Sequence, residues 1–413
     1  MISLRRPRRR VSPAFSLFWA ARTISLTGDG LVNVALVFAV VSLGGSAADI
    51  GTVLGVSMVV RVALTLVGGV LADRLPRRRM LLVSDLAQAS VQFTMAFLLL
   101  GGAARMWMLL TAAVAYGAVS AVYRPALTGI VPEIVGKGRT DELRRANAML
   151  GMSQSASRVA GPLLAGVLVA VAGPGWVYAI DGATFLVSAV CLARLRLPRT
   201  RTTDVRRAMW TELAAGWREV ISRRWYVTGL LVQSAYNLAS APLYVLGPLL
   251  VGGASAWGAV SAAGAVGAVA GAVLAARWVP NRPLSAGHLL LVFGSAPLLA
   301  LAAGAAAPVV GLAAGLGMVG TAYVNTVWAT TVQSLIPHDL MSRVSSYGGL
   351  VTLLSLPAGY ALAGQLAQTA GSTAVLVGAA ALLVLVAVPT AFLRSIRAVG
   401  QPTPVQERLS QSG

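Results

Sequence analysis

Length, composition and charge place this chain in a membrane. It has 413 residues, of which 57% are hydrophobic and only 11% charged, with a net charge of +20 and a mean hydropathy of +0.76. Soluble proteins carry about 25% charged residues, and no soluble fold could cover so much apolar surface. Apolar runs long enough to cross a bilayer recur along the chain, without the alternation of an outer-membrane barrel. We therefore expect an all-α integral membrane fold.

The apolar runs predict twelve transmembrane helices, which a polar stretch at 196–224 divides into two sets of six. The first six helices are predicted at 15–43, 50–71, 80–101, 107–130, 146–172 and 177–195. The second six are predicted at 225–251, 257–276, 284–306, 309–335, 344–370 and 373–393. We expect two six-helix bundles, 15–195 and 225–393, with tails at 1–14 and 394–413.

The N-terminal tail is strongly basic, with the run Leu4-Arg5-Arg6-Pro7-Arg8-Arg9-Arg10. A nucleic-acid arm and the n-region of a signal peptide are alternative interpretations. The apolar segment that follows is too long for a signal peptide and lacks a cleavage pattern, so we interpret the arginines as a topology anchor. We expect anionic lipid, and no nucleic acid, as the partner of this charge.

The other positive residues gather at one end of the predicted helices. Apart from three arginines inside helices, Arg105 alone falls in a loop on the opposite side. Lys and Arg near helix ends are retained in the cytoplasm. This bias predicts a multi-pass protein of a bacterial inner (plasma) membrane, with both tails and the 196–224 linker in the cytoplasm.

Charged residues inside the predicted helices are candidates for a mechanism. Asp29, Arg61 and Arg158 fall near the middle of the first, second and fifth helices, and Arg22 precedes Asp29 by two helical turns on the same face. A buried charge is costly and normally faces a partner or a cavity. We predict that Asp29, paired with Arg158 or Arg61, is a protonatable coupling site. A permanent structural ion pair is the alternative.

The turn between the second and third helices holds the run Gly68-Gly69-Val70-Leu71-Ala72-Asp73-Arg74-Leu75-Pro76-Arg77-Arg78-Arg79. Gly69, Asp73, Arg74, Arg77 and Arg78 resemble the signature loop of the major facilitator superfamily, with Pro76 at a usual glycine position. The resemblance implies a fold of two pseudo-symmetric six-helix bundles and assigns these residues to a cytoplasmic gate. The alternative is that the arginines only anchor topology.

The fifth helix contains Gly161-Pro162-Leu163-Leu164-Ala165-Gly166. Gly161, Pro162 and Gly166 resemble a superfamily motif associated with exporters, although a Gly-Pro pair is also tolerated in membrane helices as a plain kink. The order of Tyr123-Arg124-Pro125-Ala126, Val131-Pro132-Glu133 and Arg145-Ala146-Asn147-Ala148 before this motif resembles the bacterial branch that contains the enterobactin exporter and macrolide efflux proteins.

The linker at 196–224 has the pattern of an amphipathic helix lying at the membrane surface. Its apolar residues recur at helical spacing: Trp210, Leu213, Ala214, Trp217, Val220 and Ile221. We interpret it as a tether between two moving halves; a ligand-binding domain is the alternative.

Polar and aromatic residues on single faces of the fourth, seventh and tenth helices are candidates for a substrate cavity. They are Tyr116, Ser120, Tyr123, Gln233, Tyr236, Asn237, Asn325 and Trp328. The superfamily resemblance implies that these helices line the central cavity. Hydrogen bonds between helices are the alternative role for the same groups.

Catalytic and metal chemistry find little support in the sequence. Cys191 is the single cysteine, and His288 and His338 have no ligand-spaced neighbours. The GxxxxGK[ST] pattern of a nucleotide-binding loop is absent. We expect no enzyme activity, no cofactor and no metal site.

These patterns together predict a secondary active transporter that exports a small amphipathic molecule, such as a drug, antibiotic or siderophore, by alternating access and proton antiport. A role in drug resistance follows from that assignment. The expected partners are the substrate, protons and the bilayer, and we expect a monomer. An importer of a small metabolite and a transport-dead sensor or scaffold are the alternatives.

Overall fold

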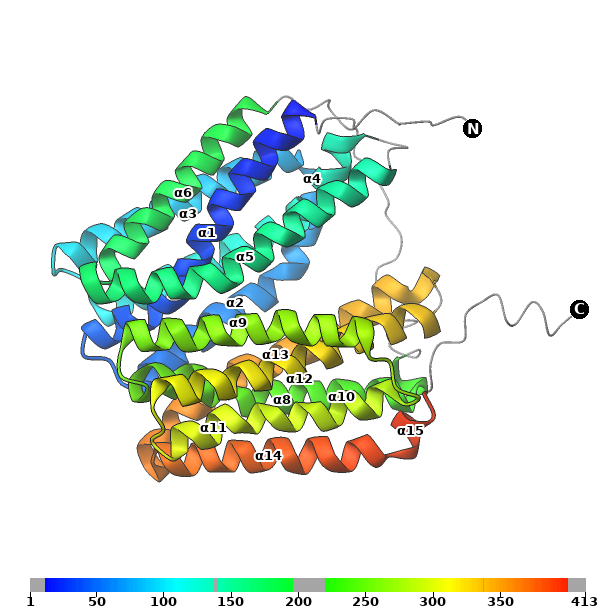
Figure 1. Cartoon of the computed structure of the whole chain (residues 1–413). Coiled ribbons are helices and arrows are strands. Elements are labelled where there is room, and N and C mark those ends of the chain that lie inside the picture. The colour runs from blue at the N-terminus through cyan, green and yellow to red at the C-terminus, as the bar shows by residue number, and fades with distance from the viewer. Residues whose placement is uncertain (1–11, 137–139, 196–219, 337, 400–413) are drawn as a thin grey trace, which may run out of the picture.

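The computed structural model describes residues 12–136, 140–195, 220–336 and 338–399, and the described part is almost entirely helical (Figure 1). The first bundle consists of α1 (Pro13–Ser42), α2 (Ala47–Arg74), α3 (Arg77–Leu100), α4 (Met106–Val135), α5 (Thr140–Ala172) and α6 (Pro174–Arg194). The second consists of α8 (Arg224–Leu250), α9 (Ala254–Arg277), α10 (Pro283–Leu291), η1 (Val292–Gly294), α11 (Ser295–Ala302), α12 (Ala307–Leu335), α13 (His338–Ala370) and α14 (Ser372–Phe392), followed by α15 (Arg394–Arg397).

The predicted all-helical membrane fold is confirmed. In the described part, ten helical segments are long and apolar enough to cross a membrane, the joined α10 to α11 segment among them. α8 and α13 are not among the ten, so a total of twelve spans stays a prediction. Most of the predicted 196–224 linker and the two tails lies outside the described residues.

Local sequence signals account for the helix ends. The Ser12 hydroxyl accepts a hydrogen bond from the Phe15 amide at 3.2 Å, and Pro13 occupies the first turn, so α1 begins with a capped end. Gly173 and Gly371 have φ of 83° and 85° in the tight α5–α6 and α13–α14 connections. A residue with a side chain rarely adopts this conformation, so both turns require glycine.

The ninth predicted span is interrupted, which the hydropathy pattern did not predict. A 3₁₀ turn at Val292–Gly294 separates α10 from α11. Pro297 has no amide hydrogen to donate to the carbonyl of Phe293, so the regular α-helical pattern cannot continue through this point. Gly294 also packs against the ring of Tyr236, where an added Cβ would lie 2.9 Å from a ring carbon.

The two bundles repeat one packing scheme. In the first, α1 packs on α5 and α6, and α2 packs on α4; in the second, α8 packs on α13 and α14, and α9 packs on α12. Such a repeat is typical of transporters built from two related halves.

Small residues join the bundles at the end where α1 finishes. A Cβ on Gly258 of α9 would lie 2.5 Å from the carbonyl oxygen of Pro162 on α5. The related contact pairs α13 with α2, where a Cβ on Gly55 would lie 3.3 Å from the carbonyl oxygen of Pro357. Towards the other end, where α1 begins, the bundles diverge (Figure 1). The fold is therefore closed at one end and spread at the other.

Candidate transport site

An ion pair and a tyrosine form a polar cluster inside the first bundle. Arg22 Nη1 lies 3.7 Å from Asp29 Oδ2, and the Tyr116 hydroxyl donates a hydrogen bond to Asp29 Oδ1 at 2.7 Å. Arg22 also donates to the Tyr123 hydroxyl at 3.4 Å, and its guanidinium lies 5.2 Å from the centre of that ring. Side-chain exposures of 12% for Arg22 and 30% for Asp29 leave the carboxylate the more accessible partner.

The predicted pairing of Asp29 with Arg158 or Arg61 is wrong, since Arg22 is the partner that the structure describes. Two helical turns on one face place Arg22 and Asp29 together. On α5, the Ser157 hydroxyl donates to the Leu26 carbonyl of α1, so the next residue, Arg158, projects elsewhere and is exposed. Arg61 lies beside α4, and its buried Nε has no hydrogen-bond partner among the described residues.

Two further carboxyl groups are fully buried behind this cluster. Asp181 on α6 accepts hydrogen bonds from Gln92 Nε2 and from the Thr184 hydroxyl, the latter at 3.3 Å. It packs against α1, where a Cβ on Gly28 would lie 2.1 Å from Asp181 Oδ1. Asp85 on α3 is 0% exposed, and neither carboxyl oxygen has a hydrogen-bond partner among the described residues.

From the sequence, Asp85 and Asp181 lie closer to the helix ends and were interpreted as packing or capping residues, although a signal for an internal face was present. Asp85, Gln88 and Gln92 recur on one face of the third predicted helix, at i, i+3 and i+7, and all three are buried. A polar stripe along an otherwise apolar membrane helix indicates an internal face.

Two arginines of the signature loop contact other helices of the first bundle. Arg77 Nη1 forms an ion pair with Glu133 of α4 at 3.0 Å. Arg78 Nε donates to the Leu192 carbonyl at 2.8 Å, and its Nη2 donates to the Ala193 carbonyl, at the end of α6. Cations at a helix C-terminus are favourable. Gly69, Asp73 and Arg74 lie in the last turns of α2, and their side chains lie outside the described residues, so the gate assignment stays a prediction.

The glycines of the fifth-helix motif permit close helix contacts. A Cβ on Gly161 would lie 2.7 Å from the Cα of Gly30 on α1, and one on Gly166 would lie 2.5 Å from the Ala254 carbonyl oxygen of α9. Pro162 lies between them, within α5. The motif therefore lets α5 pack closely against α1 of its own bundle and against α9 of the other bundle, as small residues do in membrane interfaces.

Two adjoining pockets lie in the second bundle, and the predicted cavity residues of the seventh and tenth helices line them. The larger, about 400 Å³, includes Gln233, Asn325 and Trp328. The smaller, about 240 Å³, includes Gln233, Tyr236, Asn237 and Asn325.

Several of the predicted cavity residues also hydrogen-bond to one another or to neighbouring helices. Gln233 donates to Asn237 at 3.1 Å, and the hydroxyls of Tyr236 and Thr321 are 2.5 Å apart. In the first bundle, Ser120 accepts from Gln88 at 3.5 Å. Tyr116, Ser120 and Tyr123 line neither of these two pockets, and both tyrosines belong to the Arg22–Asp29 cluster.

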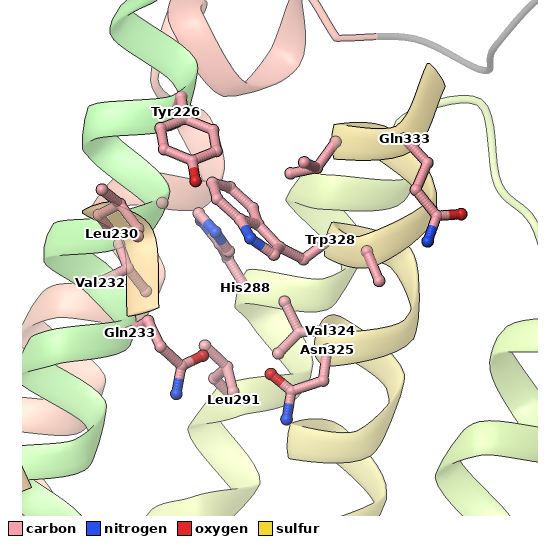
Figure 2. Close-up of a pocket in the computed structure, with 14 residues that line it drawn as sticks. Tyr226, Leu230, Val232, Gln233, His288, Leu291, Val324, Asn325, Trp328 and Gln333 are labelled. Carbon is pink, nitrogen blue, oxygen red and sulfur yellow. The ribbon is translucent and has the colours of Figure 1, made fainter. Parts of the chain in front are cut away.

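The larger pocket also contains a residue that sequence reasoning set aside. His288 of α10 lines it together with Tyr226 and Trp328 (Figure 2). Its Nδ1 is buried without a hydrogen-bond partner among the described residues. From the sequence, His288 was considered only as a metal ligand. The periodicity of one short apolar segment could not indicate that His288 lies beside polar residues of another helix.

Comparisons with known proteins agree with this architecture. The chain is 26% identical over 400 residues to the multidrug efflux pump Tap of Mycolicibacterium fortuitum, covering 93% of this chain and 96% of Tap. It is 22% identical over 237 residues to macrolide efflux protein A of Streptococcus pyogenes, covering 57% of this chain and 58% of that protein. A MFS-type transporter of Bacillus subtilis, YfiS, is 24% identical and covers 90% of this chain and 91% of its own length.

Solved transporter structures share the fold. A bacterial homologue of the human lysosomal transporter Spinster, in an inward-facing and unoccupied conformation, superposes with a TM-score of 0.71 at 16% identity, covering 95% of this chain and all 100% of the other. The nucleoside transporter NupG gives a TM-score of 0.68 at 10% identity, covering 92% of this chain and 98% of NupG. The family profile described as Major Facilitator Superfamily matches residues 18–356. The chain belongs to the major facilitator superfamily, and its resemblance to that family is confirmed.

Proposed function

We propose that this chain exports a small amphipathic molecule across a bacterial inner membrane by alternating access, driven by proton antiport. The observation that carries the proposal is the arrangement of the bundles, joined by glycine contacts at one end and spread at the other. Alternating access requires two bundles that move about a central site, and this arrangement supports one of its end states. We assign the spread end to the cytoplasm, where the positive residues concentrate.

Export is favoured over import by the relatives. Two proteins that match this chain are named as a multidrug efflux pump and a macrolide efflux protein. The pockets in the second bundle supply amide and aromatic groups, the combination that holds an amphipathic molecule in a mostly apolar site.

The Arg22–Asp29–Tyr116 cluster is our candidate for proton coupling. Asp29 is part-exposed and holds one cation and one hydroxyl, so a proton on the carboxylate would weaken the ion pair and free the Arg22 guanidinium. A change of charge at this position favours a different set of contacts and shifts the population between two conformations. A permanent structural pair would leave transport independent of this residue.

Efflux from proteoliposomes tests both parts of the proposal. Vesicles are loaded with a panel of amphipathic drugs, macrolides and siderophores, and release is followed with and without a proton gradient, for wild type and Asp29→Asn. Gradient-dependent efflux that Asp29→Asn abolishes supports antiport through Asp29. Accumulation instead of release indicates import, and no movement of any compound contradicts the transport proposal.

A further inference from the structure

The larger pocket in the second bundle has the size of a site for a small organic molecule. Its volume is about 400 Å³, and ligand pockets commonly span about 300–1,000 Å³. The described residues that line it come from α8, α10, α12 and α13, which are four helices of the second bundle.

One wall of the pocket is a fixed aromatic surface. The ring centroids of Tyr226 and Trp328 lie 5.1 Å apart, with an angle of 34° between the ring planes. The ring of Trp225 lies edge-on to that of Trp328, with a centroid distance of 5.4 Å. A Cβ on Gly229 would come within 2.0 Å of the Trp328 ring, so this ring lies directly on the backbone of α8. The Tyr226 hydroxyl donates to the Val344 carbonyl at 3.0 Å, which holds the second ring. Rings held in this way present a flat face at little entropic cost.

The described polar groups of the pocket are neutral. Gln233 and Asn325 carry amides, and His288 contributes its imidazole (Figure 2). Among the described residues that line the pocket, none is Asp, Glu, Lys or Arg. A ligand that hydrogen-bonds to such neutral groups is favoured over one that leaves them without a partner.

We propose that this pocket selects a flat, uncharged heteroaromatic part of the cargo, which stacks on Trp328 and hydrogen-bonds to His288. This inference rests on the proposed transport function and narrows it to a substrate class. A permanent cation is attracted by the tryptophan face, but it loses its hydration where none of the described lining residues supplies a carboxylate, and the desolvation cost exceeds that attraction. Protonation of His288 would add further positive charge. The pocket therefore disfavours the cationic dyes that many efflux assays employ.

Two probes of one shape separate ring stacking from charge. Phenanthridinone is a neutral three-ring lactam with a donor and an acceptor, and N-methylphenanthridinium is the permanently cationic counterpart. Isothermal titration of the full chain in nanodiscs of POPE and POPG measures binding without transport. We expect phenanthridinone to bind at least about tenfold more tightly than the cation. Equal binding, tighter binding of the cation, or binding of neither probe would overturn the inference.

Variants assign the selectivity to named residues. We expect Trp328→Ala to weaken phenanthridinone binding about tenfold. Trp107→Ala, at the exposed start of α4, serves as the matched control and leaves binding unchanged. His288→Leu removes the polar group and is expected to weaken binding about fivefold, whereas His288→Asn, which keeps a neutral polar side chain, recovers most of it.

Unchanged binding in His288→Leu would overturn the role of His288, and size-exclusion profiles of each variant exclude misfolding as the cause of a loss. The outcome is independent of the export proposal. Efflux of other compounds by a chain that prefers the cation would retain transport and reject this substrate class. Selective phenanthridinone binding without any efflux would retain the class and reject export.

Discussion

The two bundles share a packing scheme but differ in their chemistry. The first bundle buries Asp85 and Asp181 among its helices and holds the part-buried Arg22–Asp29 pair. The corresponding face of the second bundle carries amides, aromatic rings and His288, and the sequences of α8, α12 and α14 contain no acidic residue. The same packing scheme thus holds charged residues in the first bundle and neutral polar groups in the second.

We propose that this difference separates the two tasks of a coupled transporter. A charge that changes with protonation biases a conformational equilibrium, whereas neutral polar and aromatic groups recognise a cargo. We therefore expect variants in the first bundle to impair coupling without impairing binding, and variants in the second bundle to do the reverse.

The largest effect is expected from Asp29→Asn. The substitution keeps the shape of the side chain but removes the charge that pairs with Arg22, so we expect gradient-driven efflux to fall at least about tenfold. Phenanthridinone binding in nanodiscs, measured beside it, should remain unchanged. A parallel loss of efflux and binding would contradict the division between the halves.

The next largest effect is expected at the contact between Gly258 and Pro162, where the two bundles meet. In Gly258→Ala the new Cβ would lie 2.5 Å from a backbone oxygen that cannot move freely, so α5 and α9 must separate. Overpacking of this kind costs about 1–3 kcal/mol, enough to shift a conformational equilibrium about fivefold or more. Distances between spin labels at the joined end report the shift. Gly378→Ala is the control, because nothing lies within 4 Å of its position. Equal distances in both variants would show that this contact tolerates side chains.

The two buried carboxyl groups of the first bundle differ in their hydrogen bonds, and this difference predicts unequal effects on stability. Asp181→Ala leaves the amide of Gln92 without its acceptor, and we expect a loss of about 1–3 kcal/mol in stability. Asp85→Asn is the matched comparison: no described hydrogen bond is lost, so thermal stability should not fall. Comparable melting temperatures for the two variants in detergent would refute the distinction.

The smallest effect is expected at the signature loop. The Arg77–Glu133 pair is part-exposed, with side-chain exposures of 31% and 22%, so removing it should cost about 0.2–1 kcal/mol. A double-mutant cycle of Arg77→Gln and Glu133→Gln, followed by thermal unfolding, isolates this term. A coupling energy of several kcal/mol would mean that the loop stabilises the bundle far more than an anchor does.

The sequence allowed the fold to be predicted well, and the site only in part. Hydropathy located the helices, and the run around Asp73 and Arg77 identified the family. Periodicity also placed Arg22 on the face of Asp29, but it could not indicate which neighbouring helix faces a given residue, so Arg158 and Arg61 were chosen as partners. The same limit left Asp181 with a packing or capping role and His288 considered only as a metal ligand, because their surroundings depend on how helices far apart in sequence pack together.

The contact between the bundles has a further consequence for motion. At Gly258 and Gly55 the backbone of one bundle faces a proline carbonyl of the other, and an added Cβ would lie 2.5 Å or 3.3 Å from that oxygen. The nearest described atoms of the other bundle at these two positions are backbone atoms and the Cβ of Tyr360, so a relative rotation of the bundles need not pass through strained rotamers there. The joined surfaces can roll over one another in small steps, and we expect opening of this end within the microsecond to millisecond range of collective domain motions.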